Sequence, residues 1–222
     1  MTFLKGTSCE LRVLEKSDHE IQTWTRAVNA GLTTQHLITG SRPMKAYDVK
    51  AYWDAEEKAG STIFGVWTLE TELGVICAKC SRQWAVDLGG AAGRIVKCPG
   101  CNTEKTIYVH SDSSIPRFIG TCGLHSFRDI YHSYEARFLI FDPDAVGKGI
   151  GKEACKMLVS YAFMRLNAHR VWLGVSEDNT RALKCYIDCG FKYEGRLREE
   201  LYYDGKYHDA LRFAILKDEH EA

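Results

Sequence analysis

The sequence predicts an α/β protein that carries a small cysteine-rich insertion, and three observations lead to this fold class. From about residue 136 onward, apolar strand segments alternate with amphipathic helical segments. A glycine-rich loop separates one of these strands from the helix that follows it. Two pairs of cysteines lie between two strand-like segments in the N-terminal half. The first two observations indicate an α/β core, and the third indicates the insertion.

The N-terminal third predicts one strand and two helices. The strand ends near Leu14, and the first helix begins with a capping box formed by Ser17 and Glu20. The second helix extends from about Lys45 to Ala59 and ends before the stop signal Gly60. Both helices have an ordinary amphipathic pattern.

Two segments rich in β-branched and aromatic residues, 62–69 and 117–124, predict the strands of one hairpin. A hairpin connection normally has a handful of residues, whereas here about Gly74 to His110 intervenes. We therefore expect an insertion at the hairpin tip. The predicted domains are residues 1–73 with 110–222 for the main fold, and residues 74–109 for the insert.

Four of the nine cysteines fall in this insert, as Cys77-Ala-Lys-Cys80 and Cys98-Pro-Gly-Cys101. Two residues between paired cysteines let one tight turn direct both thiolates at one ion, and two such turns complete a tetrahedral shell. We predict a zinc ribbon in which Cys77, Cys80, Cys98 and Cys101 bind one Zn²⁺, with iron as the competing metal. Four thiolates leave no open coordination position, so the metal is expected to be structural. Chance cysteines in a reduced protein are the alternative.

Composition narrows the classes of partner. The 29 basic and 29 acidic residues give a formal net charge of zero, so no global field attracts nucleic acid or an anionic membrane. No apolar run approaches the roughly 18 to 20 residues of a membrane span, and residues 1–12 lack the apolar segment of a signal peptide. We expect a cytoplasmic protein with neither a membrane nor nucleic acid as partner.

The C-terminal half predicts the α/β core. Asp204-Gly205 is a strong signal for a two-residue hairpin turn, and Gly190 is a favoured residue at the end of a helix. The expected strands are residues 136–141, 171–175, 196–203 and 206–216, and the expected helices start near Gly149 and Asn179.

The loop from Asp142 to Lys152 places Gly147, Gly149 and Gly151 between a strand and a helix N-terminus. Because glycines lack side chains, backbone N–H groups in such a loop can approach a phosphate closely, and the helix dipole adds a favourable potential. The loop lacks the Ser or Thr that follows the lysine of a P-loop. Taken alone, it is equally consistent with a tight turn that binds nothing.

This loop, the strand at 171–175 and the segment from Asn179 to Phe191 follow one another in the order typical of a known family. The chain resembles the Gcn5-related N-acetyltransferase (GNAT) superfamily from Leu11 to Leu216, apart from the insert. The resemblance implies the GNAT fold, a mixed central β-sheet flanked by helices, with the zinc ribbon inserted in a β-hairpin. It also implies acetyl-CoA as co-substrate and acetyl transfer to an amine.

The resemblance implies three groups of cofactor contacts. The family's phosphate motif falls on residues 146–151, where Val146 replaces the usual Arg or Gln and Lys148 or Lys152 supplies charge instead. The preceding strand splays from its neighbour and exposes backbone groups to the pantetheine arm. The residues so assigned are Leu139, Ile140, Phe141, Val146, Gly147, Lys148, Gly149, Ile150, Gly151, Lys152, Asn179 and Ala182.

The chemistry needs an acid for the departing CoA thiolate and a base for the protonated amine. Tyr186 matches the family's usual general acid, and a packed aromatic residue on an amphipathic helix is the alternative. Glu135, which opens the central strand, is our candidate base, with His125 and His132 as weaker candidates. Because nothing marks a nucleophilic cysteine, we expect direct transfer in a ternary complex.

The run from Gly190 to Arg198 resembles a branch that includes ribosomal-protein N-terminal acetyltransferases and enzymes for amino-sugar nucleotides, amino acids, polyamines and antibiotics. We favour a small-molecule amine such as an amino sugar, because no acidic patch suits a basic ribosomal partner. A peptide N-terminus is the alternative acceptor, and Tyr202 and Asp209 are candidate acceptor contacts. A zinc-ribbon module that binds a partner or nucleic acid, on an inactive acyl-CoA scaffold, is the alternative of another class. A homodimer is retained as a candidate assembly.

Overall fold

The computed structural model describes residues 2–30, 44–69, 72–76, 80, 83–87, 94–97, 101–102, 104–107, 116–126 and 129–220. The chain divides into two compact units. The first comprises Met1–Trp67 and Phe118–Ala222, and the second comprises Thr68–Arg117. In the part of the chain that the structure describes, no helix is long and apolar enough to cross a bilayer.

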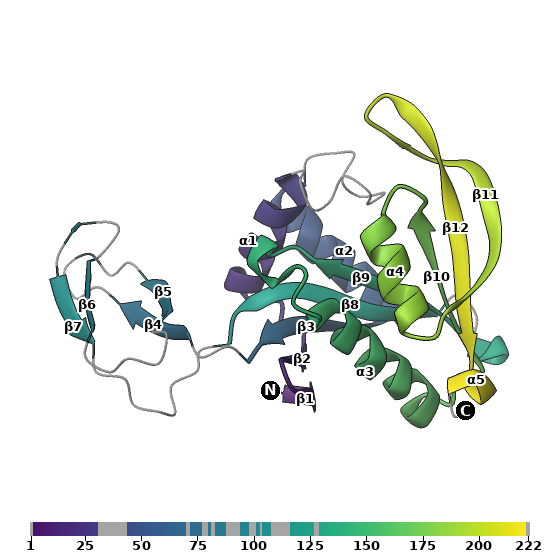
Figure 1. The fold of residues 1–222 in the computed structure, drawn as a ribbon, viewed down its shortest axis with the longest axis horizontal. Coiled ribbons are helices and arrows are strands. Elements are labelled where there is room, and N and C mark those ends of the chain that lie inside the picture. The colour runs from purple at the N-terminus through teal and green to yellow at the C-terminus, as the bar shows by residue number, and fades with distance from the viewer. Residues whose placement is uncertain are drawn as a thin grey trace. The chain divides into compact units, whose positions relative to one another are not determined.

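The first unit is built on a mixed eight-stranded sheet (Figure 1) in the order β1-β2-β3-β8-β9-β10-β12-β11. Strands β9 and β10 pair in parallel, whereas β1–β2, β3–β8, β8–β9, β10–β12 and β11–β12 are antiparallel. The strands are β1 Thr2–Lys5, β2 Cys9–Val13, β3 Thr62–Thr68, β8 Phe118–Ser126, β9 Ser133–Ile140, β10 Arg170–Ser176, β11 Lys192–Tyr203 and β12 Lys206–Leu216.

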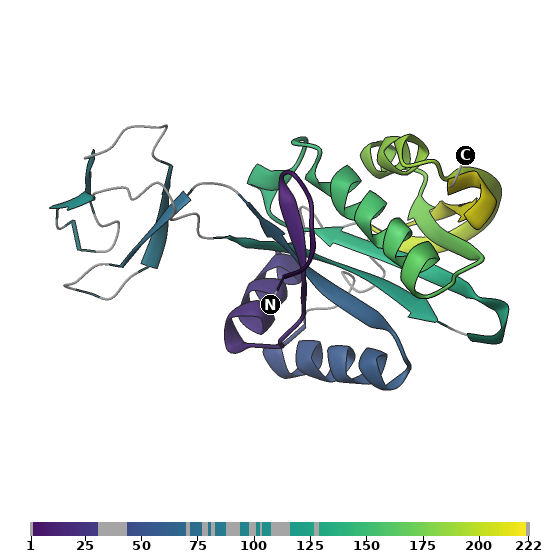
Figure 2. The ribbon, with the colours of Figure 1, turned by 90° about the horizontal axis from the view of Figure 1, so that it is seen from below.

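Helices cover both faces of this sheet. Figure 2 shows α1 and α2 on one face, and α3 and α4 on the other; we call these the α1/α2 face and the α3/α4 face. The predicted capping box is present, since the Ser17 hydroxyl accepts from the Glu20 N–H at 3.3 Å and the Glu20 carboxylate accepts from the Ser17 N–H at 2.9 Å. The helices are α1 Asp18–Asn29, α2 Ala46–Lys58, α3 Ile150–Arg165, α4 Thr180–Asp188 and α5 Lys217–His220, with short 3₁₀ turns η2 Asp129–Tyr131 and η3 Pro143–Ala145.

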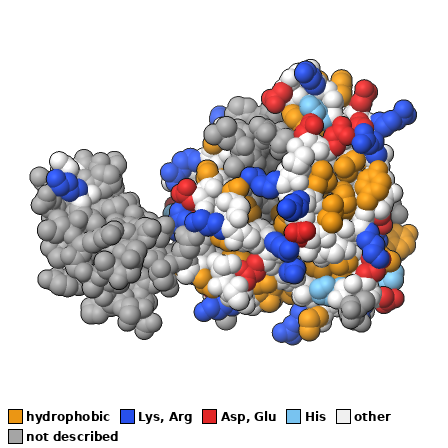
Figure 3. All heavy atoms as spheres, viewed as in Figure 1, with side chains coloured by type: hydrophobic (Ala, Val, Ile, Leu, Met, Phe, Trp, Pro, Cys, Tyr) orange, Lys and Arg blue, Asp and Glu red, His pale blue; other side chains and the backbone are white. Residues whose placement is uncertain are grey.

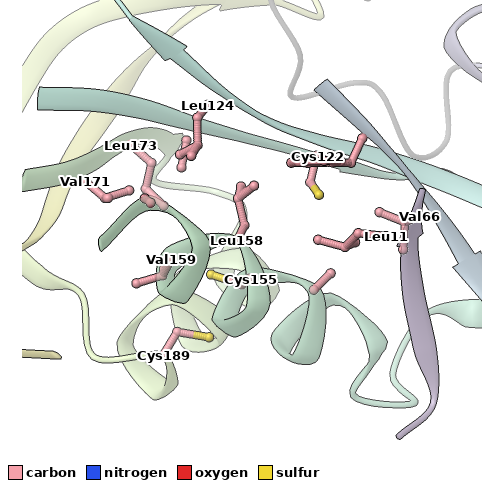
Figure 4. Packing of buried hydrophobic residues seen from close by; sticks show 14 of the residues in the cluster. Leu11, Val66, Cys122, Leu124, Cys155, Leu158, Val159, Val171, Leu173 and Cys189 are labelled. Carbon is pink, nitrogen blue, oxygen red and sulfur yellow. The ribbon is translucent and has the colours of Figure 1, made fainter. Parts of the chain in front are cut away.

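Each sheet face has its own apolar core. On the α3/α4 face, Leu158 of α3 and Leu173 of β10 lie among fully buried neighbours (Figure 4). On the α1/α2 face, Trp24 and Trp53 pack edge to face at 5.8 Å above Leu139 of β9. Each such side chain contributes about 1.5 to 3 kcal/mol by burial, so the two cores fix the sheet from both sides.

The second unit contains two hairpins of similar design. Strands β4 Glu72–Ile76 and β5 Gln83–Asp87 form the first hairpin, and β6 Arg94–Lys97 and β7 Glu104–Ile107 form the second. The segments between the paired strands, residues 77–82 and 98–103, have equal length in the sequence, and each contains one Cys-x-x-Cys pair. Cys77 and Cys98 lie outside the described residues, so the predicted four-cysteine site is only half described.

Candidate active site

The site is built around a gap in the central sheet between β9 and β10. Their parallel pairing covers only Ser133–Glu135 against Arg170–Trp172. Both strands are fully described, and beyond these positions β9 continues to Ile140 and β10 to Ser176 without pairing to each other. The sheet therefore opens just after Glu135, and backbone groups on the two facing edges are free to bind an extended ligand.

The glycine loop follows the end of β9, beyond the part that is unpaired with β10. Gly147 and Gly149 have φ angles of 81° and 82°, a left-handed conformation that costs a residue with a side chain about 1 to 2 kcal/mol. No described atom lies within 4 Å of the position that a Cβ would take at either glycine. Gly149 caps α3, so the N–H groups of Ile150 and Gly151 have no intrahelical acceptor. This geometry suits an anion such as a pyrophosphate.

Two charged side chains in the first turn of α3 hold neighbouring elements to the loop. Lys152 forms an ion pair with Asp188 of α4 at 3.1 Å, both groups being substantially exposed. The Glu153 carboxylate accepts hydrogen bonds from backbone and hydroxyl groups of Thr7 and Ser8, in the turn between β1 and β2. Burial alone would raise the pKa of Glu153, but these hydrogen bonds outweigh it and lower the pKa to about 2. The loop is therefore anchored on both sides.

Helix α4 starts beside the same gap. Asn179 is its N-cap, and the Oδ1 atom accepts from the Ala182 N–H at 3.1 Å. The amide nitrogen of Asn179 is a further donor. The sequence prediction placed both residues against the cofactor arm, and the structure brings them together through this cap.

Tyr186 of α4 lies against the unpaired part of β9. Its ring packs on Phe138 of β9 at 5.9 Å and on Phe191 at 6.0 Å between centroids. Burial is the main cause that raises the pKa of Tyr186 above its ordinary value, and the neighbouring cysteines add to it. The phenol therefore stays protonated at neutral pH, which a proton donor requires.

Glu135 lies on the opposite face of the sheet. Side chains alternate along β9, so Phe138 points to the α3/α4 face whereas Glu135 and Arg137 point to the α1/α2 face. Glu135 stands in register with His125 on β8 and with Trp172 on β10. It is thus the last carboxylate before the gap, on the side away from Tyr186.

A hydrogen-bonded network extends from Glu135 across β9 and β8 to α2. Arg137 donates to Glu135 at 2.8 Å and to Glu56 of α2 at 3.2 Å. The Glu56 Oε2 atom is 2.7 Å from the His125 Nδ1 atom and also accepts from Ser61 Oγ at 2.7 Å. Sequence reasoning missed Glu56, because it lies far along the chain from the strands. Arg137 could have been found from its position two residues after Glu135 on the same strand face.

The other candidates lie apart from this network. His132 occupies an exposed turn with φ 48°, and its carbonyl accepts from the backbone of His169 at 2.8 Å. Asp209 is held by Arg196 at 2.9 Å and by the Glu199 N–H at 2.8 Å. These contacts make Asp209 part of the β11–β12 hairpin structure.

The β11–β12 hairpin also bears Tyr202 and two surface hollows. Tyr202 packs against Tyr207 at 4.9 Å between centroids and is exposed. Hollows of about 380 and 630 Å³ lie on β10–β12–β11. The residues lining the first are Arg170, Trp172, Glu194, Gly195, Arg196, Leu197 and Arg212. Basic and acidic side chains are interspersed over the face seen in Figure 3, so no single sign of charge dominates it.

Comparison with known proteins identifies the family. Residues 10–192 match the model described as the acetyltransferase (GNAT) domain. The chain therefore belongs to the GNAT acetyltransferase family, as the resemblance of its loop and helix motifs implied.

Individual relatives cover a part of the chain. The spermidine N(1)-acetyltransferase of Escherichia coli (strain K12) is 33% identical over 122 residues, which are 52% of this chain and 65% of that protein. The putative ribosomal N-acetyltransferase YdaF of Bacillus subtilis (strain 168) is 32% identical over 102 residues, 46% of this chain and 55% of that protein. The chain thus spans less than two thirds of either relative.

A solved structure supports the fold. The spermidine N-acetyltransferase of Vibrio cholerae, determined in complex with CoA and spermine, superposes with a TM-score of 0.66. The match covers 96% of this chain and 98% of that chain at 20% sequence identity. At this identity, the likeness shows that the two proteins share a fold.

Proposed function

We propose that the protein is an acetyl-CoA-dependent N-acetyltransferase that acts on a primary amine of a small molecule. One observation carries the proposal: the glycine loop that caps α3 follows the unpaired segment of β9, and Tyr186 of α4 packs on Phe138 within that same segment. The anion site suits the pyrophosphate of acetyl-CoA, and the free strand edges suit its pantetheine arm. The protonated phenol suits the thioester.

Residues of this chain have distinct tasks in the proposed transfer. The amides of residues 147–152 bind the pyrophosphate, with Lys148 adding charge, and the free edge of residues 139–141 binds the arm. Asn179 adds a contact to the arm. The amine attacks the thioester carbonyl directly, and Tyr186 gives its proton to the departing sulfur. Glu135, on the other face of the gap, is the carboxylate that meets the incoming ammonium.

The acceptor class follows from relatives rather than from a visible pocket. Two relatives are named for different acceptors, spermidine and a ribosomal substrate. A small aliphatic amine such as a polyamine is therefore the first acceptor to test, followed by an amino sugar. A peptide N-terminus is the alternative.

Two measurements in sequence test the function. Calorimetric titration with acetyl-CoA should show saturable binding at one site. A panel of polyamines, amino sugars and peptide N-termini should then release CoA thiol with at least one amine. Binding without turnover on any amine would favour the inactive-scaffold alternative, and absence of binding would refute the proposal.

We also propose that the second unit is a zinc ribbon. In each of its two hairpins, β4–β5 and β6–β7, the six residues of sequence between the paired strands contain one Cys-x-x-Cys pair. Of the four cysteines, Cys80 is exposed and Cys101 is partly exposed. Among the described residues no cluster of three metal-binding side chains occurs, which is expected when half of the four-cysteine set falls outside them. Zinc would hold together a segment too small for a core of its own.

Metal analysis tests the zinc proposal. The purified protein should contain about one zinc per chain. Cys98→Ser should lose most of it, whereas Cys122→Ser, which removes a buried thiol of the main unit, should keep it. Full zinc retention in Cys98→Ser would contradict the four-cysteine assignment. The candidate homodimer and the expected cytoplasmic location stay predictions, which sedimentation velocity and cell fractionation would test.

A further inference from the structure

The network on the α1/α2 face contains a buried histidine that is hydrogen-bonded to a carboxylate. The proposed transfer gives this histidine no role. We infer that His125 of β8, oriented by Glu56 of α2, takes the proton from the acceptor ammonium. This inference rests on the proposed function and deepens it. His125 is then a catalytic residue and Glu56 a positioning residue, while Glu135 orients the ammonium.

The contacts of Glu56 fix the tautomer of His125. The carboxylate lies 2.7 Å from Nδ1 and can only accept a hydrogen bond, so the neutral ring carries its proton on Nδ1. The Nε2 atom is then the basic nitrogen of the ring. Ser61 at 2.7 Å and Arg137 at 3.2 Å hold the carboxylate in place, so the hydrogen-bond partner of the ring has a fixed position. This is how a carboxylate orients the base of a catalytic triad.

The position of His125 suits a base for the acceptor. It faces Glu135 directly across the β8–β9 ladder, which places their Cβ atoms about 5 Å apart. Glu135 is the last paired residue before the gap opens. His125 therefore lies on the same sheet face as the incoming amine, on the side opposite to Tyr186. Its side chain is 4% exposed, so bulk water does not compete freely for its proton.

Among the described residues, the charges around the ring balance only when it is protonated. The charged groups that act on it are Glu56 from α2 and Glu135 and Arg137 from β9, and Tyr52 of α2 adjoins the same three groups. With a neutral ring these groups sum to one negative charge, because Tyr52 is uncharged and Arg137 offsets one of two carboxylates. A proton on His125 brings the sum to zero. The network is thus prepared for the charge that the ring acquires.

The resting ring is neutral at pH 7 for identifiable reasons. Burial, followed by the charge of Arg137, lowers the pKa of His125 below its usual 6.5, although Glu56 and Glu135 oppose this. Burial alone would raise the pKa of Glu56, but hydrogen bonds from Ser61 and His125 lower it, so that carboxylate stays ionised. An imidazole is also a stronger base than a carboxylate in its ordinary form.

The proton balance of the reaction is complete with these groups. The ammonium gives one proton to Nε2 of His125, and the free amine forms the C–N bond at the thioester carbonyl. The C–S bond then breaks, and the sulfur leaves with its electron pair. Tyr186 protonates the sulfur and recovers a proton from the acetylated nitrogen. His125 finally releases its proton to solvent.

The test is the pH profile of kcat/KM with the best amine of the panel. His125→Gln should lower kcat/KM about 100-fold near pH 7. The loss should shrink as the pH approaches about 10, because an aliphatic amine then arrives unprotonated. Glu56→Gln keeps the size of the side chain and a hydrogen-bond acceptor for Nδ1. Without the carboxylate charge, the pKa of His125 falls, so the acid limb of the profile should move to lower pH.

A neighbouring carboxylate provides the matched control. Glu57 is the next residue on α2, is exposed and pairs with Lys16. Glu57→Gln should reproduce the wild-type profile. A loss in His125→Gln that is constant across pH would show a structural role and overturn the inference. If that variant does not fold, an unshifted acid limb in Glu56→Gln overturns it instead.

The two proposals fail in different ways. A wild-type protein that binds acetyl-CoA but acetylates no amine refutes the proposed function. An active wild type whose variants lack these pH signatures refutes only the role of His125 and Glu56.

Discussion

The two faces of the sheet at β9 differ in how they control a proton. On the α3/α4 face, Tyr186 lies among apolar rings and thiols, and burial keeps its hydroxyl protonated. On the α1/α2 face, Glu56, Arg137 and Glu135 form a connected set of charges around His125. Apolar surroundings thus favour the neutral, protonated form of Tyr186, whereas the charged groups around His125 favour the protonated ring that forms when it accepts a proton. The strand between them keeps the two groups on opposite faces of the sheet.

The largest effect is expected on the acid face. Tyr186→Phe removes the proton donor but leaves the ring packing with Phe138, so kcat should fall about 100-fold while acetyl-CoA affinity stays the same. Steady-state kinetics and calorimetric titration measure the two quantities. An unchanged kcat would remove Tyr186 as the acid and leave it as a packing residue.

Two glycines have a left-handed backbone conformation, one beside each sheet face. Comparing Ala variants at the two positions distinguishes the cost of backbone strain from a loss of ligand binding. Gly149 precedes α3 with φ 82°, and Gly60 follows α2 with φ 81°; neither has a described atom within 4 Å of its Cβ position. Substitution with Ala should lower the free energy of unfolding by about 1 to 2 kcal/mol at both positions. Only Gly149→Ala should weaken acetyl-CoA binding, about tenfold. Equal affinities in the two variants would mean that the loop does not bind the cofactor.

Two helix-capping residues allow a similar comparison of variants on the two sheet faces. Asn179 caps α4 on the α3/α4 face, and Ser17 caps α1 on the α1/α2 face. Ala at either position should cost about 1 kcal/mol of stability, as measured by urea unfolding. Asn179→Ala should additionally reduce acetyl-CoA affinity, because its amide is the proposed contact to the arm. If Ser17→Ala reduces the affinity as much, the effect is one of general stability.

An effect on stability alone concerns the anchoring of the glycine loop. The pKa of Glu153 is lowered to about 2 in the folded protein, against an ordinary value of 4.5. A lowered carboxyl pKa stabilises the fold above pH 4.5, and this contribution is lost as the pH falls from 4.5 towards 2. Glu153→Gln should therefore be about 1 to 2 kcal/mol less stable than wild type at pH 7, with the difference vanishing in acid. Parallel unfolding curves across this range would contradict the anchoring role.

The sequence predicted the elements around the gap well because their signals are local. The Ser17 capping box, the helix end at Gly190 and the Asp204-Gly205 turn depend on backbone preferences of neighbouring residues, and all three occur in the structure. The order of strands and helices after residue 133 also follows from hydrophobic periodicity. The short strand β1 was not foreseen, because its four residues are mostly exposed.

The polar network could not be predicted in full, because it joins elements that are distant along the chain. Glu56 occupies the polar pattern of an ordinary amphipathic helix, and nothing local indicates that it meets His125. The same holds for Glu153 and the turn at Thr7. Lys152 was expected to supply charge to the cofactor, but it also pairs with Asp188 of α4. Roles of this kind emerge only when the chain is folded.

The junction of the second unit has a consequence for how the protein can be engineered. The Thr68 N–H donates to the Arg117 carbonyl at 3.0 Å, and the Arg117 N–H donates to the Thr68 hydroxyl at 3.2 Å. Thr68 and Arg117 are therefore paired with each other at the two ends of residues 69–116. Each doubling of the length of an inserted loop adds only about 0.6 kcal/mol to the free energy of loop closure. We expect that a short turn, or a foreign module of unrelated sequence, can replace residues 69–116 while the Thr68–Arg117 pair is kept and β3 and β8 stay paired.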